Sequence, residues 1–339
     1  NNGGIYPIPL LAFAAFQLMF AIITPALISG AIADRTKFVS WALFVTIWVS
    51  IVYFPVAHWV FAFGNKVGDK ITGAGFLAAR GVEDFAGGTA VHINAGAAGL
   101  ALAIVLGKRI GWQRSPMRPH SLPLVLLGAG LLWFGWFGFN AGSALGANGT
   151  AALALVNTQV ATAAALIGWV ATEKFRDGHP TSLGAASGAV AGLVAITPAC
   201  AFVAPWAAVV IGLLAGIICA LAVGLKYRFG FDDALDVVGV HLVGGIVGCL
   251  LIGFFGSKAV NSVGIDGLFY GGGWTLLGKQ ALGVAVVAGY SFFVTLILGF
   301  IIEKTIGFRV RVEDEQVGVD LSEHAESAYE MGGILKGGR

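Results

Sequence analysis

Nine long runs of apolar residues, almost free of charged side chains, constrain the fold of this chain more than any other feature of its sequence. A helix needs about 20 apolar residues to cross the hydrocarbon core of a bilayer. Only 11% of the 339 residues are charged, whereas soluble domains average about 25%. An ordinary soluble enzyme is therefore excluded, and an all-α polytopic membrane protein is predicted. We expect spans at 8–32, 38–63, 84–106, 122–145, 151–172, 183–202, 206–225, 236–255 and 281–302.

The positions of lysine and arginine predict the orientation of these spans, because cytoplasmic loops retain positive charge. If the first span starts outside, the cytoplasmic loops and the C-terminal tail hold 15 of the 20 basic residues. The sequence thus predicts an N-terminus outside, a transmembrane domain over residues 1–302 and a cytoplasmic tail over residues 303–339.

An internal repeat links the third and the eighth predicted spans. The two copies share a pattern at an offset of 149 residues, Asp84-x7-His92-x3-Gly96-x2-Gly99 and Asp233-x7-His241-x3-Gly245-x2-Gly248. Because the copies are five spans apart, an odd number, the second is inverted relative to the first. A five-span repeat that ends at the eighth span begins at the fourth. The first repeat, which ends at the third span, therefore has only three of its five spans in this sequence. We therefore expect inverted five-helix repeats plus a final helix, with nine of eleven helices present and two more preceding residue 1.

His92 and His241 are the most informative residues of the repeat. An ionisable group inside a span is costly and is by default a candidate for a substrate pathway. Each histidine is followed by glycines four and seven residues later, so its helix face is bare and two backbones can approach closely. Two imidazoles that meet can share and pass a proton. A pair of packing histidines and a metal or bis-histidine haem site are the alternatives.

Two further features of the spans are candidates for a site. Phe139 and Ser143 lie four residues apart on one helix face, where a ring and a hydroxyl suit a small cation, or where the ring merely anchors the helix in lipid. Asp84 opens the third span, as an N-cap or as a group that recruits cations.

Composition narrows the choice of partners and cofactors. The formal net charge is only +2 and the basic residues form no stripe, so no nucleic-acid partner is expected. Cys200, Cys219 and Cys249 lie in apolar runs without the spacing of a metal or disulfide framework, and we interpret them as packing residues.

Several motifs together resemble the ammonium transporter family (Amt/MEP, and more distantly Rh), over nearly the whole chain. The motifs are Asp84-Phe-Ala-Gly-Gly-Thr-x-Val-His92-Ile-Asn-Ala, Gly135-Trp-Phe-Gly-Phe139-Asn-Ala-Gly-Ser143, Thr197-Pro-Ala-Cys200, Asp236-Val-x-Gly-Val-His241 and the tail pattern Gly318-x-Asp-x-x-x-His324-x-Glu-x-x-Tyr329.

This resemblance implies roles for individual residues. His92 and His241 correspond to the twin histidines of the pore, and Phe20 and Phe139 to its stacked aromatic gate. Phe139 and Ser143 correspond to part of the outer ammonium site, and Asp84 to a buried acid that shapes the vestibule. The family usually has tryptophan in the outer site where this chain has Phe61, which keeps a ring face but loses the indole donor.

The resemblance also implies an activity and partners. It predicts a homotrimer in the cell membrane that deprotonates ammonium outside and conducts ammonia through a hydrophobic pore, with no enzymatic activity and no cofactor. It further implies a PII-type regulator at the cytoplasmic face. An ammonium sensor and an Rh-like gas channel are the alternative functions.

Overall fold

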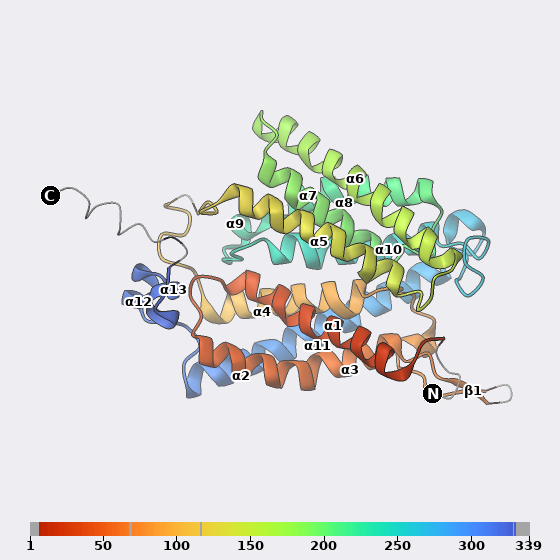
Figure 1. Ribbon diagram of the computed structural model, residues 1–339, viewed down its shortest axis with the longest axis horizontal. Coiled ribbons are helices and arrows are strands. Elements are labelled where there is room, and N and C mark those ends of the chain that lie inside the picture. The colour runs from red at the N-terminus through yellow and green to blue at the C-terminus, as the bar shows by residue number, and fades with distance from the viewer. Residues whose placement is uncertain (1–6, 68–69, 116, 328, 330–339) are drawn as a thin grey trace.

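The computed structural model describes residues 7–67, 70–115, 117–327 and 329, and these form a bundle of long helices (Figure 1). The bounds of the long helices are α1 Leu10–Ile32, α2 Phe38–Trp48, α3 Phe54–Phe61, α4 Asn94–Leu106, α5 Leu122–Gly142, α6 Gly149–Asp177, α7 Ser182–Ile196, α8 Pro205–Ala222, α10 Val243–Phe255 and α11 Thr275–Thr305. The described chain also contains three π-helical turns. The turn η1 Val49–Tyr53 joins α2 to α3, η3 Gly88–Ile93 continues directly into α4, and η4 Val238–Leu242 continues directly into α10.

Short elements lie at the two ends of the bundle. The strands β1 Asn65–Val67 and β2 Lys70–Thr72 pair antiparallel, with the turns η2 Ala78–Arg80 and η5 Leu268–Tyr270. The helices α9 Leu225–Phe229, α12 Val312–Val317 and α13 Val319–His324 complete the described chain. Figure 1 shows β1 and the tail helices α12 and α13 at opposite ends, which we name the hairpin end and the tail end.

The prediction of a polytopic helical membrane protein is confirmed, since eight helices among the described residues are long and apolar enough to cross a bilayer. The sixth predicted span, 183–202, is only partly right. It is helical over Ser182–Ile196, and the buried segment 197–203 that follows is not helical. Thr197 still has helical backbone angles, but Pro198 has no N–H to continue the helical hydrogen bonds, and the helix ends at Ile196. The β-hairpin is an addition that the predicted spans did not include.

Close helix packing relies on small residues, as is typical of membrane bundles. In α8, a Cβ added at Gly212 or Gly216 would collide with the backbone carbonyls of Ala161 and Ala165 in α6. The contact between these two helices is therefore made backbone to backbone.

The η1 turn follows from one proline. Pro55 has no N–H to donate back to the carbonyl of Ile51, and the Tyr290 hydroxyl from α11 donates to that carbonyl at 2.7 Å instead. The freed acceptor thus ties the α2–α3 segment to α11.

The two repeat copies cross the bundle in opposite directions. The segment from Gly88 to Leu106 runs from the hairpin end to the tail end, where Arg309 donates to the Leu106 carbonyl at 2.8 Å. The segment from Val238 to Phe255 starts at the tail end and runs back. This antiparallel pair is what the inverted repeat predicts.

Candidate functional site

His92 and His241 meet in the interior of the bundle. Their Nδ1 atoms lie 3.2 Å apart, and their rings are nearly parallel, with centroids 5.3 Å apart. Both side chains are buried, with exposed fractions of 1% and 8%. One Nδ1 must donate and the other accept, so at least one imidazole is neutral. The Nε2 of His92 is buried and has no hydrogen-bond partner within the described part of the chain.

Reciprocal glycines bring the two histidines together. A Cβ at Gly96 would lie 2.5 Å from the backbone nitrogen of Leu242, which follows His241. A Cβ at Gly245 would lie 2.9 Å from Ile93, which follows His92, and 3.3 Å from the Cβ of His92 itself. The glycine face of each helix therefore contacts the residue that follows the histidine of the other helix, as the repeat pattern predicts.

An aspartate holds the first turn before each histidine. The Asp84 carboxylate accepts hydrogen bonds from the backbone N–H groups of Gly87, Gly88 and Thr89 at 2.7 Å, from that of Ala90 at 3.3 Å and from the Thr89 hydroxyl. Asp233 accepts from the N–H groups of Val237 and Val238. These bonds occupy the unpaired donors at a helix start. The third predicted span therefore begins as a helix at Gly88, because residues 84–87 form the capping turn.

Aromatic rings continue from the histidines toward the hairpin end. The centroid of Phe139 lies 6.1 Å from His92 and 4.5 Å from Phe20, and Phe20 lies 6.2 Å from Phe61. Phe20 is 3% exposed, and Phe61 and Phe139 are half-buried. The sequence-predicted residues thus form one row from Phe61 to His241, which we name the aromatic–histidine row and which comprises Phe61, Phe20, Phe139, His92 and His241.

Ser143 lies at the hairpin end of α5. Its hydroxyl donates to the Phe139 carbonyl at 2.8 Å, and the side chain is half-buried. The hydroxyl oxygen keeps lone pairs to accept a further hydrogen bond. Ser143 and Phe139 therefore share one helix face, as their spacing predicts.

Trp136 is a neighbour of this row that sequence reasoning missed. Its ring stacks on His92 with centroids 5.3 Å apart and an angle of 16°. Its indole N–H donates to the Thr197 hydroxyl at 2.8 Å, which fixes the ring against the imidazole. The position of Trp136, three residues before Phe139 on the same helix, was the signal that could have identified it.

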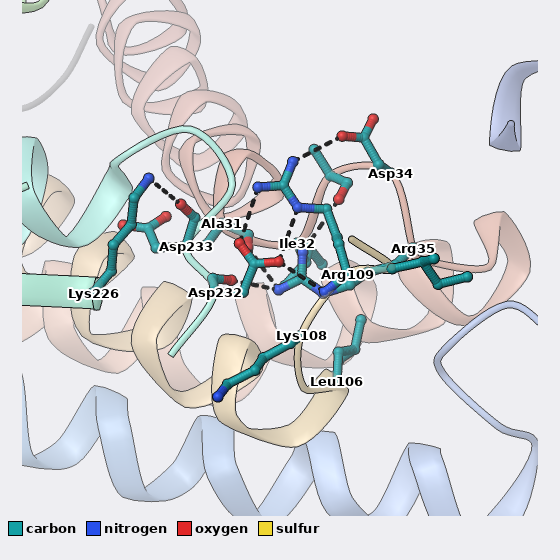
Figure 2. A network of polar contacts seen from close by, with 12 residues as sticks. Ala31, Ile32, Asp34, Arg35, Leu106, Lys108, Arg109, Lys226, Asp232 and Asp233 are labelled. Atoms are coloured by element: carbon teal, nitrogen blue, oxygen red, sulfur yellow. Dashed lines mark hydrogen bonds and ion pairs between the residues drawn. The ribbon is translucent and has the colours of Figure 1, made fainter. Parts of the chain in front are cut away.

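An ionic network around the buried Asp232 lies at the tail end, just before the second capping aspartate (Figure 2). Arg109 pairs with Asp232 at 2.9 Å and with Asp34 at 3.0 Å, while Arg35 donates to the Asp232 carbonyl at 2.6 Å. Burial alone would raise the pKa of Asp232, but the hydrogen bonds and charge of Arg109 outweigh it and hold the pKa below the usual value. Burial lowers the pKa of Arg35 to about 10. Sequence reasoning identified none of these contacts.

Glu83 is the equivalent of Asp232 at the hairpin end, because it precedes Asp84 as Asp232 precedes Asp233. Its carboxylate accepts from the Ile265 N–H at 2.6 Å, and its backbone exchanges hydrogen bonds with the amide of Gln280. Burial raises the pKa of this carboxyl to about 7, against the opposing effects of the Ile265 N–H and Lys279. The equivalent acids Glu83 and Asp232 therefore have different partners at the two ends of the bundle.

Comparison with known proteins identifies relatives over almost the whole chain. The profile of the Ammonium Transporter Family matches residues 3–329. An ammonium transporter of Mycobacterium tuberculosis (strain H37Rv) is 59% identical over 330 residues, which cover 96% of this chain and 69% of the relative. An ammonium transporter of Bacillus subtilis is 47% identical over 324 residues, covering 95% and 77% of the two chains.

Solved structures share the fold as well as the sequence. Candida albicans Mep2 superposes with a TM-score of 0.82 at 35% identity, covering 91% of this chain and 68% of that one. A structure titled "Sensor Amt Protein" superposes with a TM-score of 0.80 at 32% identity, covering 91% and 75%.

Proposed function

This chain belongs to the Ammonium Transporter Family, and from that premise we propose that ammonium crosses the membrane along the aromatic–histidine row. The observation that carries the proposal is the contact of His92 with His241 at 3.2 Å, directly behind the rings of Phe139 and Phe20. In this proposal, a row of ring faces that ends in two buried imidazoles gives the substrate an apolar path with one polar relay.

The first step is collection of the cation at the hairpin end, which we assign to the outside. Phe61 and Phe139 offer ring faces, to which a small cation is attracted while it loses water. Ser143 offers a hydroxyl oxygen as acceptor of an ammonium N–H. The smaller quadrupole of Phe61 compared with tryptophan makes this outer site weaker.

The second step is loss of a proton before or at the constriction formed by Phe20 and Phe139. Their centroids lie 4.5 Å apart, and Phe20 is buried. A charged ion in such an apolar passage is strongly disfavoured, whereas neutral ammonia is not. Potassium has nearly the size of ammonium but cannot give up a proton, and this row has no ring of carbonyl oxygens to replace the potassium hydration shell.

The third step is passage of ammonia beside His92 and His241. The paired imidazoles donate and accept one hydrogen bond between them, so a proton can be shared within the pair. Trp136 stacks on His92 and holds the His92 imidazole nearly parallel to the imidazole of His241.

Asp84 has a positioning role in this proposal. Its carboxylate already accepts hydrogen bonds from the backbone N–H groups of residues 87–90 and therefore caps this turn. It shapes the entrance by fixing the start of the helix that carries His92.

The assembly and orientation follow from the family relationship in the same proposal. We assign the chain to the cell membrane as a homotrimer, with the transmembrane domain over residues 1–302, the hairpin end outside and the tail end cytoplasmic. A PII-type protein is the proposed regulator at the cytoplasmic end.

Transient currents test the proposal. The full-length transporter, in proteoliposomes, is exposed to an ammonium concentration jump, beside His92→Ala, His241→Ala and a potassium jump as control. We expect a current for ammonium that is lost in both variants, and none for potassium. An unchanged current in both variants would refute the role of the histidine pair. If wild type gives no current but an ammonium gradient still shifts internal pH, transport is electroneutral.

A sensor is the second candidate, favoured by the similarity to the structure titled "Sensor Amt Protein". The same proteoliposomes distinguish the two functions. A sensor binds ammonium without moving either charge or internal pH, so silence in both assays supports it.

A further inference from the structure

Gln280 is a buried amide side chain that the proposed transport steps do not use. It lies near the start of α11, the helix that follows both repeat copies in the chain, and its exposed fraction is 0%. A buried primary amide is costly unless its donors and its acceptor are paired. The partners of Gln280 therefore show what this side chain holds in place.

The amide of Gln280 is hydrogen-bonded to both repeat copies at once. Its Oε1 accepts from the Glu83 N–H at 2.8 Å, and its Nε2 donates to the Glu83 carbonyl at 2.7 Å. The same Nε2 donates to the Cys249 carbonyl at 3.1 Å. Glu83 lies nine residues before His92 in the first copy, and Cys249 lies eight residues after His241 in the second. One side chain thus joins the segment that leads to the first histidine to the helix that follows the second.

The next turn of α11 packs against the same segment. Gly283 lies three residues after Gln280 and therefore on the same helix face. A Cβ added at Gly283 would lie 2.7 Å from Cγ1 of Val82, the residue before Glu83. The bare surface at Gly283 lets α11 come close enough for the short amide contacts.

The bonds of Gln280 supply a restraint that the glycine contacts lack. Gly96 and Gly245 fix how closely the two histidine helices approach, but one region of close contact leaves rotation about it unrestrained. Cys249 lies about 12 Å along the helix from His241, at a rise of 1.5 Å per residue. A bond at that distance from the contact restrains the crossing angle of the two helices. The Nδ1 atoms are 3.2 Å apart, and a hydrogen bond tolerates only a few tenths of an ångström beyond that.

The second copy has a corresponding contact at the tail end. Asp232 occupies the position of Glu83, and its carbonyl accepts from Nη2 of the buried Arg35 at 2.6 Å. In both copies a buried donor from a distant part of the chain therefore holds the carbonyl of the residue before the capping aspartate. The donors are an amide and a guanidinium, so the feature that the copies share is the restrained carbonyl.

We propose that Gln280 is a positioning residue for the histidine pair. It fixes the crossing of the two helices and thereby keeps His92 and His241 at hydrogen-bond distance. Its consequence for transport rests on the proposed function, in which this pair forms the polar relay. The side chain itself lies outside the aromatic–histidine row.

Nuclear magnetic resonance of the full-length protein in proteoliposomes tests the proposal, with nitrogen-15 in the histidine rings. The measurement is the coupling between the two Nδ1 nuclei across the N–H···N bond, assigned by its loss in His92→Ala and in His241→Ala. We expect this coupling in wild type and its loss in Gln280→Leu, which removes all three amide bonds. Gln280→Glu keeps an oxygen for the Glu83 N–H but removes both donors. It should weaken the coupling in the same way, and it carries the test if the leucine variant does not fold.

Thr295→Val is the matched control, because it also removes a buried hydrogen bond of α11. The Thr295 hydroxyl accepts from the Trp48 indole N–H at 2.8 Å, and this bond joins α11 to α2. We expect the control to retain the coupling. Unchanged coupling in a folded Gln280 variant, or an equal loss in Thr295→Val, would overturn the proposal.

Ammonium currents separate this proposal from the proposed function. We expect Gln280→Leu to lower the maximal current at least about fivefold and to leave the half-saturating ammonium concentration within about twofold, because the outer rings are unaffected. Loss of coupling with a full current would uphold the positioning role of Gln280 and refute the relay role of the histidines. Intact coupling with a full current would overturn the role of Gln280 and leave the proposed function standing.

Discussion

The Nδ1 atoms of His92 and His241 lie 3.2 Å apart, although the residues are 149 positions apart in the chain and stand on antiparallel helices. Both imidazoles are buried, and this contact joins a polar atom of one ring to a polar atom of the other. Removal of one ring leaves a buried polar atom unpaired, which costs about 1–3 kcal/mol.

A double-mutant cycle measures this dependence. We expect His92→Leu and His241→Leu each to lower the free energy of unfolding, and the double variant to cost at least about 1 kcal/mol less than the sum. Thermal unfolding of the four proteins in detergent provides the readout. Strict additivity would contradict a direct bond between the rings.

The two capping aspartates should differ in their contribution to stability. Asp84 accepts from the N–H groups of residues 87–90, whereas Asp233 accepts from those of Val237 and Val238 alone. We expect Asp84→Ala to cost roughly 3 kcal/mol and Asp233→Ala about 1–2 kcal/mol. Hydrogen exchange should accelerate at the amides of residues 87–90 in the first variant only. Equal costs would contradict the bonding pattern.

Glu83 should make stability depend on pH. Its folded pKa of about 7 lies above the ordinary value of 4.5 because the carboxyl is buried, so the folded protein retains a proton that the unfolded chain releases. The free energy of unfolding should therefore fall by about 3 kcal/mol as pH rises from 4.5 to 7, and stay level above that. Lys279 and Asp266 face this carboxyl with opposite effects.

Glu83→Gln is the matched control, because glutamine keeps an oxygen for the Ile265 N–H and stays neutral. Melting temperatures of both proteins between pH 5 and pH 8 provide the comparison. The difference between the two curves should disappear at the acidic end and favour the variant at pH 8. Parallel curves would show that Glu83 does not titrate in this window.

Added methyl groups should test the contact between the two repeat helices. The Cβ of Gly96→Ala would lie 2.5 Å from a backbone nitrogen that cannot move alone, so we expect a loss of about 1–3 kcal/mol. Gly138→Ala in α5 is the control, because nothing lies within 4 Å of its Cβ position and alanine favours the helix. Similar melting temperatures for the two variants would contradict the close approach.

Phe61→Trp should strengthen the proposed outer site. Tryptophan has the stronger attraction for cations, which corresponds to a roughly two- to fivefold lower half-saturating ammonium concentration in the current assay. Phe61→Leu should raise that concentration, since the ring face is lost. A shift in the same direction for both variants would remove Phe61 from the site.

The sequence predicts the helical spans well because hydropathy and length determine whether a segment can cross a bilayer. Its failure at 197–203 shows the limit of that measure. These residues are as apolar and as buried as a span, yet Thr197-Pro198 ends the helix. Hydropathy reports burial, whereas backbone conformation depends on local chemistry.

The histidine pair could be predicted because the repeat gives both residues the same surroundings. The partners of Glu83 and Asp232 could not be predicted. Gln280 and Arg35 are each 197 residues away from the acidic residue whose backbone they contact, and nothing in the repeat pattern indicates them. Such contacts are set by which helix ends happen to meet, which depends on the packing of the whole bundle.

The backbone contact at Gly96 and Gly245 has a consequence for how this molecule can change over time. The two helices approach closely because Gly96 faces the backbone of Leu242, while Gly245 faces the Ile93 side chain and the Gly88 carbonyl. The spacing of the two helices beside the proposed passage therefore depends on the glycines, whereas its polar chemistry depends on the histidines. We therefore expect a substitution at position 92 or 241 to change the chemistry of the proposed passage while the two helix backbones keep their close approach.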